Sequence, residues 1–315
     1  MPRRLHTSTM LPAIILALVA CTKTDKSTAA GIEEQKITHV SPCAHPLLWK
    51  IHGQRPSYVF GTIHVPDDRV LALSKSVTNA IDGCDELNTE IPMDMGTQLS
   101  TATKMMLPDG KTLEQVLPKK LYKKLEGLFT AKGFPFAPLN RMKIWAITAQ
   151  VVLLDHLLEF STKKPLDMVI YLRAQKNGKR VGGIETVEEQ LSVFDSLTIK
   201  EQVRMLQQTL DQLDEFRAKG SDPVTELLDA YLKGDEKNLY DTMMETYDPT
   251  NPLDKKIMKR LFFDRNIRMA DRMAAKLKKN EKSSFFFAVG AGHLLGDQGV
   301  VSLLRKKGFK LTRVK

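Results

Sequence analysis

Two histidines follow apolar segments that are far apart in this sequence, and each comes three residues after a glycine. Gly61-x-x-His64 lies in YVFGTIHVPD, and Gly290-x-x-His293 lies in FFFAVGAGHLLGD. Imidazole binds divalent transition metals and exchanges protons near neutral pH. For either histidine alone, a hydrogen-bonded position in the core is the alternative. The repeated pattern favours a shared site, and we expect the glycines to permit tight backbone bends that direct both rings to one centre.

Two glutamates also follow segments that are typical of strands. Glu90 ends DELNTE, and Glu185 follows KRVGGI. In open α/β sheets, sites form at the carboxyl ends of the strands. Two imidazoles with one or two carboxylates suit Mn, Co or Zn, and such a centre polarises a carbonyl and activates water. The hypothesis is therefore a metal site of His64, Glu90, Glu185 and His293, in which a spare carboxylate such as Glu185 acts as general base. A helix-terminal charge or an ion pair is the alternative for each glutamate.

The segment FFDRNIRMADRMA contains a block of arginines. Helical spacing places Arg265 and Asn266 on the same side as Phe262 and Met269, which should face the core. A buried arginine needs a carboxylate or a charged ligand, so Arg265 could pair with a glutamate or hold an oxyanion. We include Arg265 and Asn266 among the catalytic candidates. Asp167, at the start of an apolar helix, is interpreted as an acid of the first helical turn.

The elements that position these residues alternate between strands and helices. Strands are expected at 58–63, 85–91, 179–184, 284–289 and 309–314. Helices are expected at 68–81, 121–129, 145–160 and 261–277, and Thr186 and Thr198 begin capping boxes. The predicted fold class is α/β (α+β), with a central mixed β-sheet, flanking helices and helical insertions at about 94–164 and 196–280.

The first 21 residues are typical of a secretory signal. Arg3 and Arg4 precede a short apolar stretch at 11–20, which ends in Leu-Val-Ala before Cys21. This ending resembles a bacterial lipobox, so we expect cleavage after residue 20 and lipidation of Cys21. An ordinary signal peptide is the alternative. Residues 21–40 are then the lipidated cysteine and a flexible tether, and 41–315 form the domain. The expected location is the outer membrane of the bacterial envelope, facing the periplasm or the surface.

Net charge and cysteine content indicate which partners and which covalent links to expect. The net charge of +10 falls to +8 when two signal arginines leave, and the basic residues are scattered, so nucleic acid is not an expected partner. The other cysteines, Cys43 and Cys84, form an even pair in an oxidising compartment, which predicts a disulfide. Two separate buried thiols are the alternative.

Five blocks of this sequence resemble the TraB/PrgY/GumN group, which includes the TIKI proteins. The blocks are LLWKI…SYVFGTIHVPDDRVLAL, DELNTEIPMD, PLDMVIYLRAQKNGKRVGGIETVEEQ, LFFDRNIRMADRM and FFFAVGAGHLLGDQGVVSLLRKKGFKLTRV. The resemblance implies a divalent-metal-dependent hydrolase, with peptidase activity in the TIKI branch and Mn or Co as the metal. It also implies an α/β core related to ChaN-like and erythromycin-esterase-like proteins. His64, Glu90, Glu185 and His293 match its site positions, and the pair 265–266 matches its arginine block.

Three functions remain open at this stage. The first is a lipid-anchored metallohydrolase that cleaves exported peptides or proteins. The second is an envelope lipoprotein that binds metal, haem or peptide without turnover. The third is an interaction protein whose histidines are structural. A catalyst should lose turnover but keep its ligand when the base is changed to Gln, whereas structural histidines should cost stability when replaced by Ala.

Overall fold

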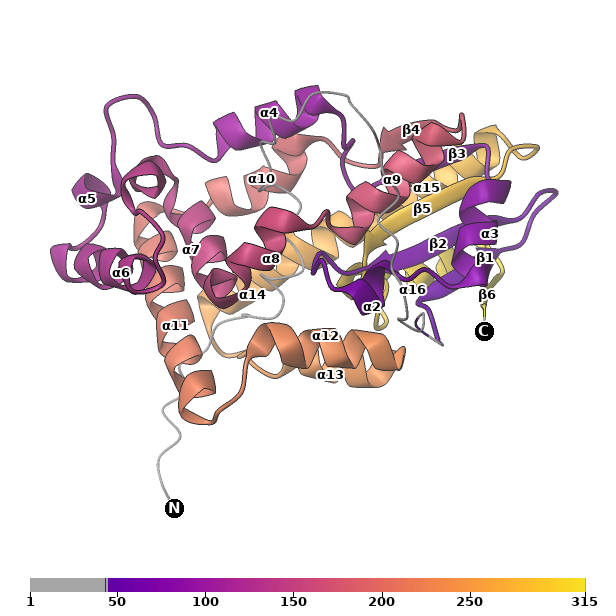
Figure 1. The fold of residues 1–315 in the computed structure, drawn as a ribbon. Helices are drawn as coiled ribbons and strands as arrows, with labels where there is room; N and C mark the ends of the chain where they lie inside the picture. The colour runs from indigo at the N-terminus through magenta and orange to yellow at the C-terminus, as the bar shows by residue number, and fades with distance from the viewer. Residues whose placement is uncertain (1–42, 44, 315) are drawn as a thin grey trace, which may run out of the picture.

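A six-stranded mixed β-sheet forms the centre of the protein (Figure 1). The computed structural model describes Cys43 and residues 45–314. The expected signal peptide, the lipidated Cys21 and the tether at 22–40 therefore lie outside the described residues. The strand order is β4-β3-β5-β2-β1-β6. The strands are β1 (Leu48–Ile51), β2 (Ser57–Thr62), β3 (Glu86–Thr89), β4 (Arg180–Gly183), β5 (Phe285–Gly290) and β6 (Leu311–Arg313).

Strand direction divides the sheet into two parts. Strands β4, β3, β5 and β2 are mutually parallel, whereas β1 runs antiparallel to both β2 and β6. The fold class and the five expected strands are confirmed. Strand β1 was not predicted, because its four residues, LWKI, are too short to show a period. All six residues of β5 are buried, as expected for a strand in the middle of a covered sheet.

Helices cover both faces of the sheet. Figure 1 shows α3 (Lys75–Gly83) and α9 (Leu166–Lys176) on one face, and α15 (Asp264–Lys279) and α16 (Val300–Lys306) on the other. This division follows from right-handed crossovers: the chain moves toward β4 through α3 and α9, and returns toward β6 through α15 and α16.

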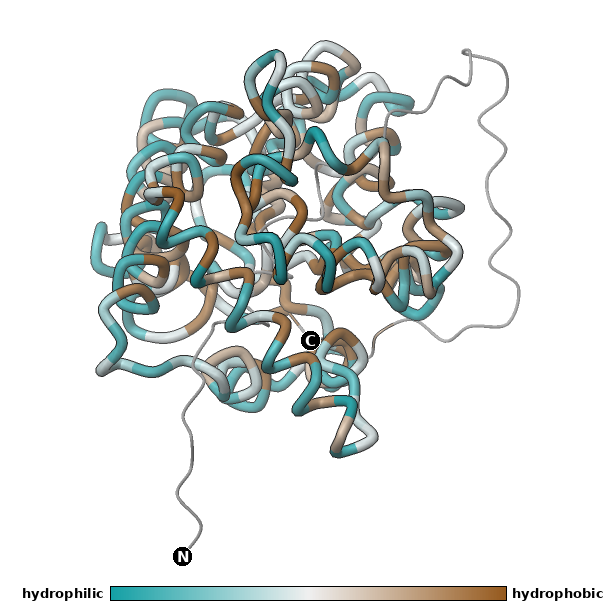
Figure 2. Tube along the Cα trace, turned by 90° about the vertical axis from the view of Figure 1, so that its left-hand side faces the viewer, coloured by the Kyte–Doolittle hydropathy of each residue, from teal (hydrophilic) through white to brown (hydrophobic). Residues whose placement is uncertain are grey.

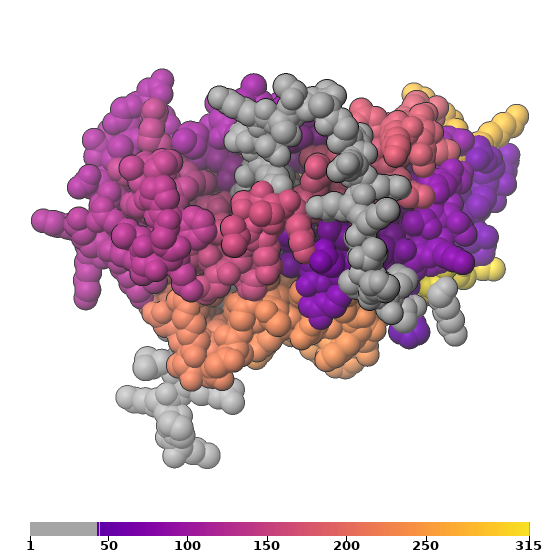
Figure 3. Space-filling view, viewed as in Figure 1, coloured from indigo at the N-terminus to yellow at the C-terminus, as the bar shows by residue number. Residues whose placement is uncertain are grey.

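The remaining helices form a large part beside the sheet. They are α2 (Asp68–Leu71), α4 (Met95–Lys104), α5 (Leu113–Val116), α6 (Lys119–Ala131), α7 (Ile144–Val152), α8 (Leu157–Thr162), α10 (Val187–Asp195), α11 (Ile199–Ala218), α12 (Pro223–Lys233), α13 (Glu236–Met244) and α14 (Pro252–Met258). Teal and brown alternate along these helices in Figure 2, as amphipathic packing requires. In Figure 3 the orange segment that includes α12 and α13 covers the lower side of the molecule. The capping boxes at Thr186 and Thr198 are present at the starts of α10 and α11.

Three expected helices have different boundaries in the structure. The stretch 68–81 is two helices, because the Ser74 side chain caps α3 by accepting from Val77 N. The stretch 145–160 is interrupted by a 3₁₀ turn, Leu154–His156, between α7 and α8. The stretch 261–277 begins inside a π-helical segment, η4 (Lys259–Phe263), which joins α14 to α15.

The length and composition of the described helices bear on whether they could cross a membrane. Among the described residues no single helix is long and apolar enough to cross a membrane. One pair, Ile144–Val152 with Leu154–Lys176, has suitable length and composition but is bent by 59°. Every residue of α7 within it is buried in the protein, as in the core helix of a folded domain.

The expected Cys43–Cys84 disulfide is not formed in this structure, where both thiols are free. The Cys43 thiol donates to Leu232 O at the end of α12, and the Cys84 thiol donates to Ile81 O at the end of α3. The reason is strand direction. Cys43 precedes the antiparallel β1, which begins at the carboxyl end of β2, whereas Cys84 precedes β3 and lies at the opposite edge of the sheet.

Candidate active site

Four parallel strands deliver the four candidate ligands to one edge of the sheet. His64, Glu90, Glu185 and His293 follow the carboxyl ends of β2, β3, β4 and β5. The strand order places them along the edge as Glu185, Glu90, His293 and His64. At about 4.8 Å per strand, the strands that carry Glu185 and His64 are roughly 14 Å apart. Glu90 and His293 come from neighbouring strands.

His64 is held by a buried carboxylate. The Asp167 Oδ2 atom accepts from His64 Nδ1 at 2.7 Å, and its Oδ1 atom accepts from the Thr62 hydroxyl at 2.7 Å. The His64 and Asp167 side chains are each at most 2% exposed. His64 Nε2 is buried and has no hydrogen-bond partner among the described residues. The ring is therefore fixed by Nδ1, and Nε2 remains available.

Asp167 is the functional residue that sequence reasoning missed. It does lie in the first turn of α9, as interpreted, but its side chain is buried against β2. The only sequence signal was a charged residue within the apolar face of a helix. The partner could not be known before α9 was placed over β2.

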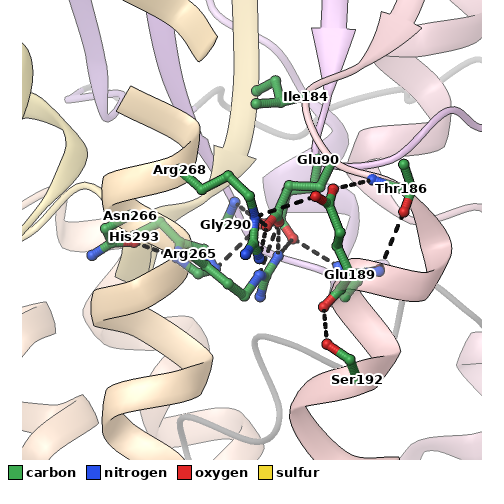
Figure 4. Close-up of polar contacts among 12 residues, drawn as sticks. Glu90, Ile184, Thr186, Glu189, Ser192, Arg265, Asn266, Arg268, Gly290 and His293 are labelled. Carbon is green, nitrogen blue, oxygen red and sulfur yellow. Dashed lines mark hydrogen bonds and ion pairs between the residues drawn. The ribbon is translucent and has the colours of Figure 1, made fainter. Parts of the chain in front are cut away.

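His293 has a matching arrangement with an amide. Asn266 Nδ2 donates to Gln298 O, which leaves Asn266 Oδ1 facing the ring at 2.7 Å from His293 Nδ1. The Nδ1–H group therefore donates, and Nε2 carries the free lone pair. His293 Nε2 lies 3.6 Å from Glu90 Oε1, which is too long for a hydrogen bond. Figure 4 shows Asn266 beside His293.

Arg265 joins the two glutamates. Its Nη2 donates to Glu90 Oε2 at 2.6 Å (Figure 4), and its Nε donates to Glu185 Oε2 at 2.9 Å. Arg265 is fully buried, as its helical spacing predicted. Its Nη1 is buried without a partner in the described structure, so one N–H-bearing atom remains for an anionic ligand or water.

The two glutamates differ in how many hydrogen bonds their carboxylate oxygens already accept. Arg268 donates to Glu185 Oε1 through Nε and Nη2, at 2.9 and 2.6 Å, so both oxygens of Glu185 are held by arginines. Glu90 Oε2 accepts from Arg265 and from Gln190, whereas among the described residues Glu90 Oε1 accepts only from the Gly290 backbone N–H. Glu90 Oε1 therefore keeps acceptor capacity that Glu185 lacks.

Burial and charge set the protonation states. Burial alone would lower the pKa of His64, but Asp167 and then Glu90 raise it above its ordinary value. Burial, with the Arg265 cation, lowers the pKa of His293 to about 3, so its ring is neutral near pH 7. Burial alone would raise the pKa of Glu90, but Arg265 and the two histidines hold it well below its ordinary value. Glu90 is therefore an anion at neutral pH.

A divalent metal fits part of this set. Both histidines have Nδ1 fixed by an acceptor oxygen and Nε2 free, which is the arrangement that orients metal-ligating histidines. Glu90 Oε1 lies 3.6 Å from His293 Nε2. Glu185 does not fit, because the arginines occupy both of its oxygens. Within the described ranges, no three His, Cys, Asp or Glu side chains are grouped closely enough to hold one ion.

The glycines of the two motifs do not act through backbone bends. Neither Gly61 nor Gly290 has a positive φ. A Cβ on Gly61 would lie 3.1 Å from Ala291 Cα, from Leu294 Cδ1 and from Leu47 Cβ. Gly61 therefore provides space between β2 and the turn that carries His293, which corrects the expectation of a tight bend.

Comparison with known proteins defines the family. The family model described as TraB/PrgY/gumN family matches residues 47–313, which include every site residue described above. This chain belongs to the TraB/PrgY/gumN family. The resemblance stated from the sequence is thereby confirmed.

Several relatives within this family group carry the name metalloprotease. Metalloprotease TIKI2 of Danio rerio is 28% identical over 310 residues, covering 84% of this chain and 60% of the relative. A metalloprotease TIKI homologue of Nematostella vectensis is 28% identical, covering 85% of this chain and 67% of the relative. Metalloprotease TIKI2 of Xenopus tropicalis is 29% identical, covering 84% and 59%. The chain thus spans about 60% of the length of the first of these relatives. No solved structure gives a significant match.

In this TraB/PrgY/gumN family member, the expected site residues fall into two groups with different contacts. His64, Glu90 and His293 present free or partly free ligand atoms at the sheet edge. Glu185 and Arg265 form the adjoining ion-pair network, with Arg268 on its outer side. The expected residues are therefore gathered at one edge, but their roles differ.

Proposed function

We propose that this protein is a divalent-metal-dependent peptidase whose reaction centre is formed by His64, Glu90 and His293, which metal binding would draw closer together than they lie in this structure. The observation that carries the proposal is the pair of buried imidazoles with Nδ1 held and Nε2 free. The metalloprotease names of the relatives support the reaction class. When bound, a divalent ion supplies a Lewis acid and activates water for hydrolysis. Mn or Co is the metal expected, with Zn as the alternative.

The protein's own residues would contribute orientation and charge. Asp167 and Asn266 hold the two rings in the required tautomers. Glu90, anionic and held by Gly290 N–H, would accept a proton through Oε1 or bind the ion there. The partnerless Nη1 of Arg265 would donate to the oxygen on which negative charge develops as the carbonyl is attacked. Glu185 would keep Arg265 in place.

One structural observation favours a second candidate, metal or peptide binding without turnover. Both oxygens of Glu185 and one oxygen of Glu90 are held by arginine, so no carboxylate in this network is fully free to act as a base. Glu90→Gln separates the candidates. A peptidase should lose about 10²- to 10⁴-fold in turnover while still binding peptide. A capture protein has no turnover to lose, and the substitution changes binding alone.

Metal binding should be measured first, by calorimetry on metal-stripped residues 22–315 with Mn, Co and Zn. We expect stoichiometric binding that His64→Ala and His293→Ala each abolish, with folding checked by circular dichroism. His156→Ala is the matched control, because His156 pairs with Asp222 outside this edge of the sheet. If folded wild-type protein binds none of the three ions, or both substitutions leave binding intact, the proposal fails.

We also propose that the protein is held on the outer membrane of a bacterial envelope through a lipidated Cys21, with exported peptides or proteins as substrates. The lipobox-like ending at Cys21 supports this location. Mass spectrometry of the N-terminal peptide from membrane fractions should show an acylated Cys21, and Cys21→Ala should release the protein into the soluble fraction. An unmodified N-terminus at another residue would contradict the anchor.

A further inference from the structure

A pocket of about 220 Å³ lies beside His293. Its walls come from α13, from the end of α14 with the π-helical segment η4, and from the turn after β5. The apolar side chains that line it are Tyr240, Met243, Met244, Met258, Phe262, Phe263 and Leu295. None of these residues belongs to the ligand set described above. The pocket is therefore a separate feature that needs its own explanation.

Three lining residues connect the pocket to the proposed reaction centre. Asn266 lines the pocket and also holds His293 Nδ1 at 2.7 Å. Gly292 lines the pocket and immediately precedes His293 in the chain. The Phe262 ring, another part of the wall, lies 5.1 Å from the His293 ring, centroid to centroid. A group bound in the pocket would therefore lie next to His293.

The π-helical segment explains why one continuous helical stretch provides so much of the wall. Regular α-helical spacing would place Met258, Phe262 and Asn266 on one side, and would direct Phe263 away by about 100°. The wider turns of η4, Lys259–Phe263, allow consecutive phenylalanines to line the same pocket. Such π segments are frequently found at functional sites, which favours binding over packing as the role of this wall.

Gly292 lets the side chains of the pocket wall lie close to the backbone next to His293. A Cβ at this position would lie 2.4 Å from Met243 Cε and 2.9 Å from Phe262 Cε1. The glycine therefore lets α13 and η4 approach the chain next to His293. Its φ is not positive, so close approach rather than backbone conformation accounts for the glycine.

We propose that this pocket binds one apolar side chain of a peptide substrate, of the leucine, methionine or phenylalanine class. The inference rests on the proposed peptidase function, because it assigns the pocket to the residue held next to the reacting bond. Methionine side chains are flexible and polarisable, so Met243, Met244 and Met258 can adapt to several apolar shapes. An acidic side chain would lose its hydration there without gaining a cationic partner. Asp297, at the polar end of the pocket, further disfavours acidic residues.

The test uses a capped peptide series, acetyl-Ala-Ala-X-Ala-Ala-amide, in which X is Leu, Met, Phe, Ala or Asp. Binding to metal-free and metal-loaded protein is measured by calorimetry, and cleavage is followed separately by mass spectrometry. One methylene in an apolar pocket changes affinity by about tenfold or more. We therefore expect Leu, Met and Phe peptides to bind at least about tenfold tighter than the Ala peptide, and the Asp peptide to bind most weakly.

Pocket variants show whether the preference arises here. Met244→Trp fills the pocket from a half-buried position and should remove the preference for large apolar residues. Phe263→Ala enlarges the pocket, so it should shift the preference toward Phe, which keeps the test valid if the tryptophan variant does not fold. Met142→Trp is the matched control, since Met142 is also half-buried but does not line the pocket.

The outcomes for the pocket and for the peptidase are separable. An apolar binding preference that Met244→Trp removes supports the pocket, even if no peptide is cleaved; in that case the proposed peptidase function fails by itself. Cleavage without any preference at X overturns the pocket and leaves the peptidase standing. A preference that persists unchanged in both pocket variants also overturns the assignment.

Discussion

At the scale of single residues, Asp167 and Asn266 determine what the two histidines can do. Each places an acceptor oxygen 2.7 Å from a histidine Nδ1, one from helix α9 and one from α15. Without such a partner a buried neutral imidazole could adopt either tautomer. With it, the neutral form of each ring carries its lone pair on Nε2. The availability of these nitrogens therefore depends on residues that are not themselves expected ligands.

Asp167→Asn should weaken metal binding by about 10- to 100-fold, because loss of the carboxylate that orients a ligating histidine has this effect in metal sites. Calorimetry with the metal that wild type binds most tightly measures the change. Asp68→Asn, an exposed acid at the start of α2, is the control and should bind like wild type. Equal affinities for wild type and Asp167→Asn would show that this contact does not support a metal.

Arg265→Met should lower the free energy of unfolding by about 3 to 5 kcal/mol, because it leaves the buried Glu90 and Glu185 without their shared cation. Arg268→Met is the matched comparison. Arg268 also pairs with Glu185, but its side chain is 30% exposed, so water can replace it at a smaller cost. Urea unfolding of the three proteins measures both differences, and equal losses would contradict this account of burial.

At the scale of elements, the start of α10 combines a cap with an ion pair. Glu189 accepts from Thr186 N in the capping box and from Arg272 on α15. Hydrogen bonding to Arg272 lowers the pKa of Glu189 more than burial raises it, so this pKa falls from 4.5 to about 2. The stability that Glu189 contributes is thus present above about pH 4.5 and is lost as the pH falls toward 2.

Glu189→Gln tests this pH dependence, since glutamine can still complete the capping box but cannot ionise. Wild type should be the more stable protein near pH 6, and the difference should shrink as the pH approaches about 3. Urea unfolding of both proteins across this range gives the comparison. A difference that stays constant with pH would mean that the Arg272 ion pair contributes nothing.

The ends of α3 and α12 hold the two free thiols. Burial raises the pKa of Cys84 to about 11, and thiolate is the reactive form, so Cys84 should alkylate slowly in the native state. Cys43 is only half-buried and should react first. Protein of residues 22–315, which lacks Cys21, should take up two alkyl groups when it is unfolded without reductant, by mass spectrometry. Uptake of none before reduction and two afterward would establish the disulfide that this structure lacks.

At the scale of the whole molecule, metal binding and folding are linked. Strands from four separate parts of the chain form the edge that carries the site, so the unfolded chain has no preformed site. A metal at about 100 times its dissociation constant should then raise the free energy of unfolding by about 2.7 kcal/mol. His293→Ala should lose this increase, whereas Glu185→Gln should keep it, because Glu185 is already occupied by arginines. Loss in both variants would restore Glu185 as a ligand.

Much of the fold could be predicted from the sequence because the relevant signals are local. Apolar, β-branched or alternating segments bounded by turn residues indicated five of the six strands, and capping boxes indicated the starts of α10 and α11. Helical spacing indicated that Arg265 and Asn266 would be buried. Since strand ends in a parallel sheet meet at one edge, the gathering of the candidate site residues there could also be expected.

The sequence by itself thus determined which residues are buried, which follow strands and which could bind a metal, because burial periodicity and side-chain chemistry are properties of neighbouring residues. Only the tertiary structure decided which residues are partners. The strand order separates Glu185 from His64, the position of α9 gives His64 its carboxylate, and the antiparallel β1 keeps the two thiols apart. These pairings join residues up to 200 positions apart, such as Glu90 with Gly290. The crossovers that bring them together leave no local pattern in the chain.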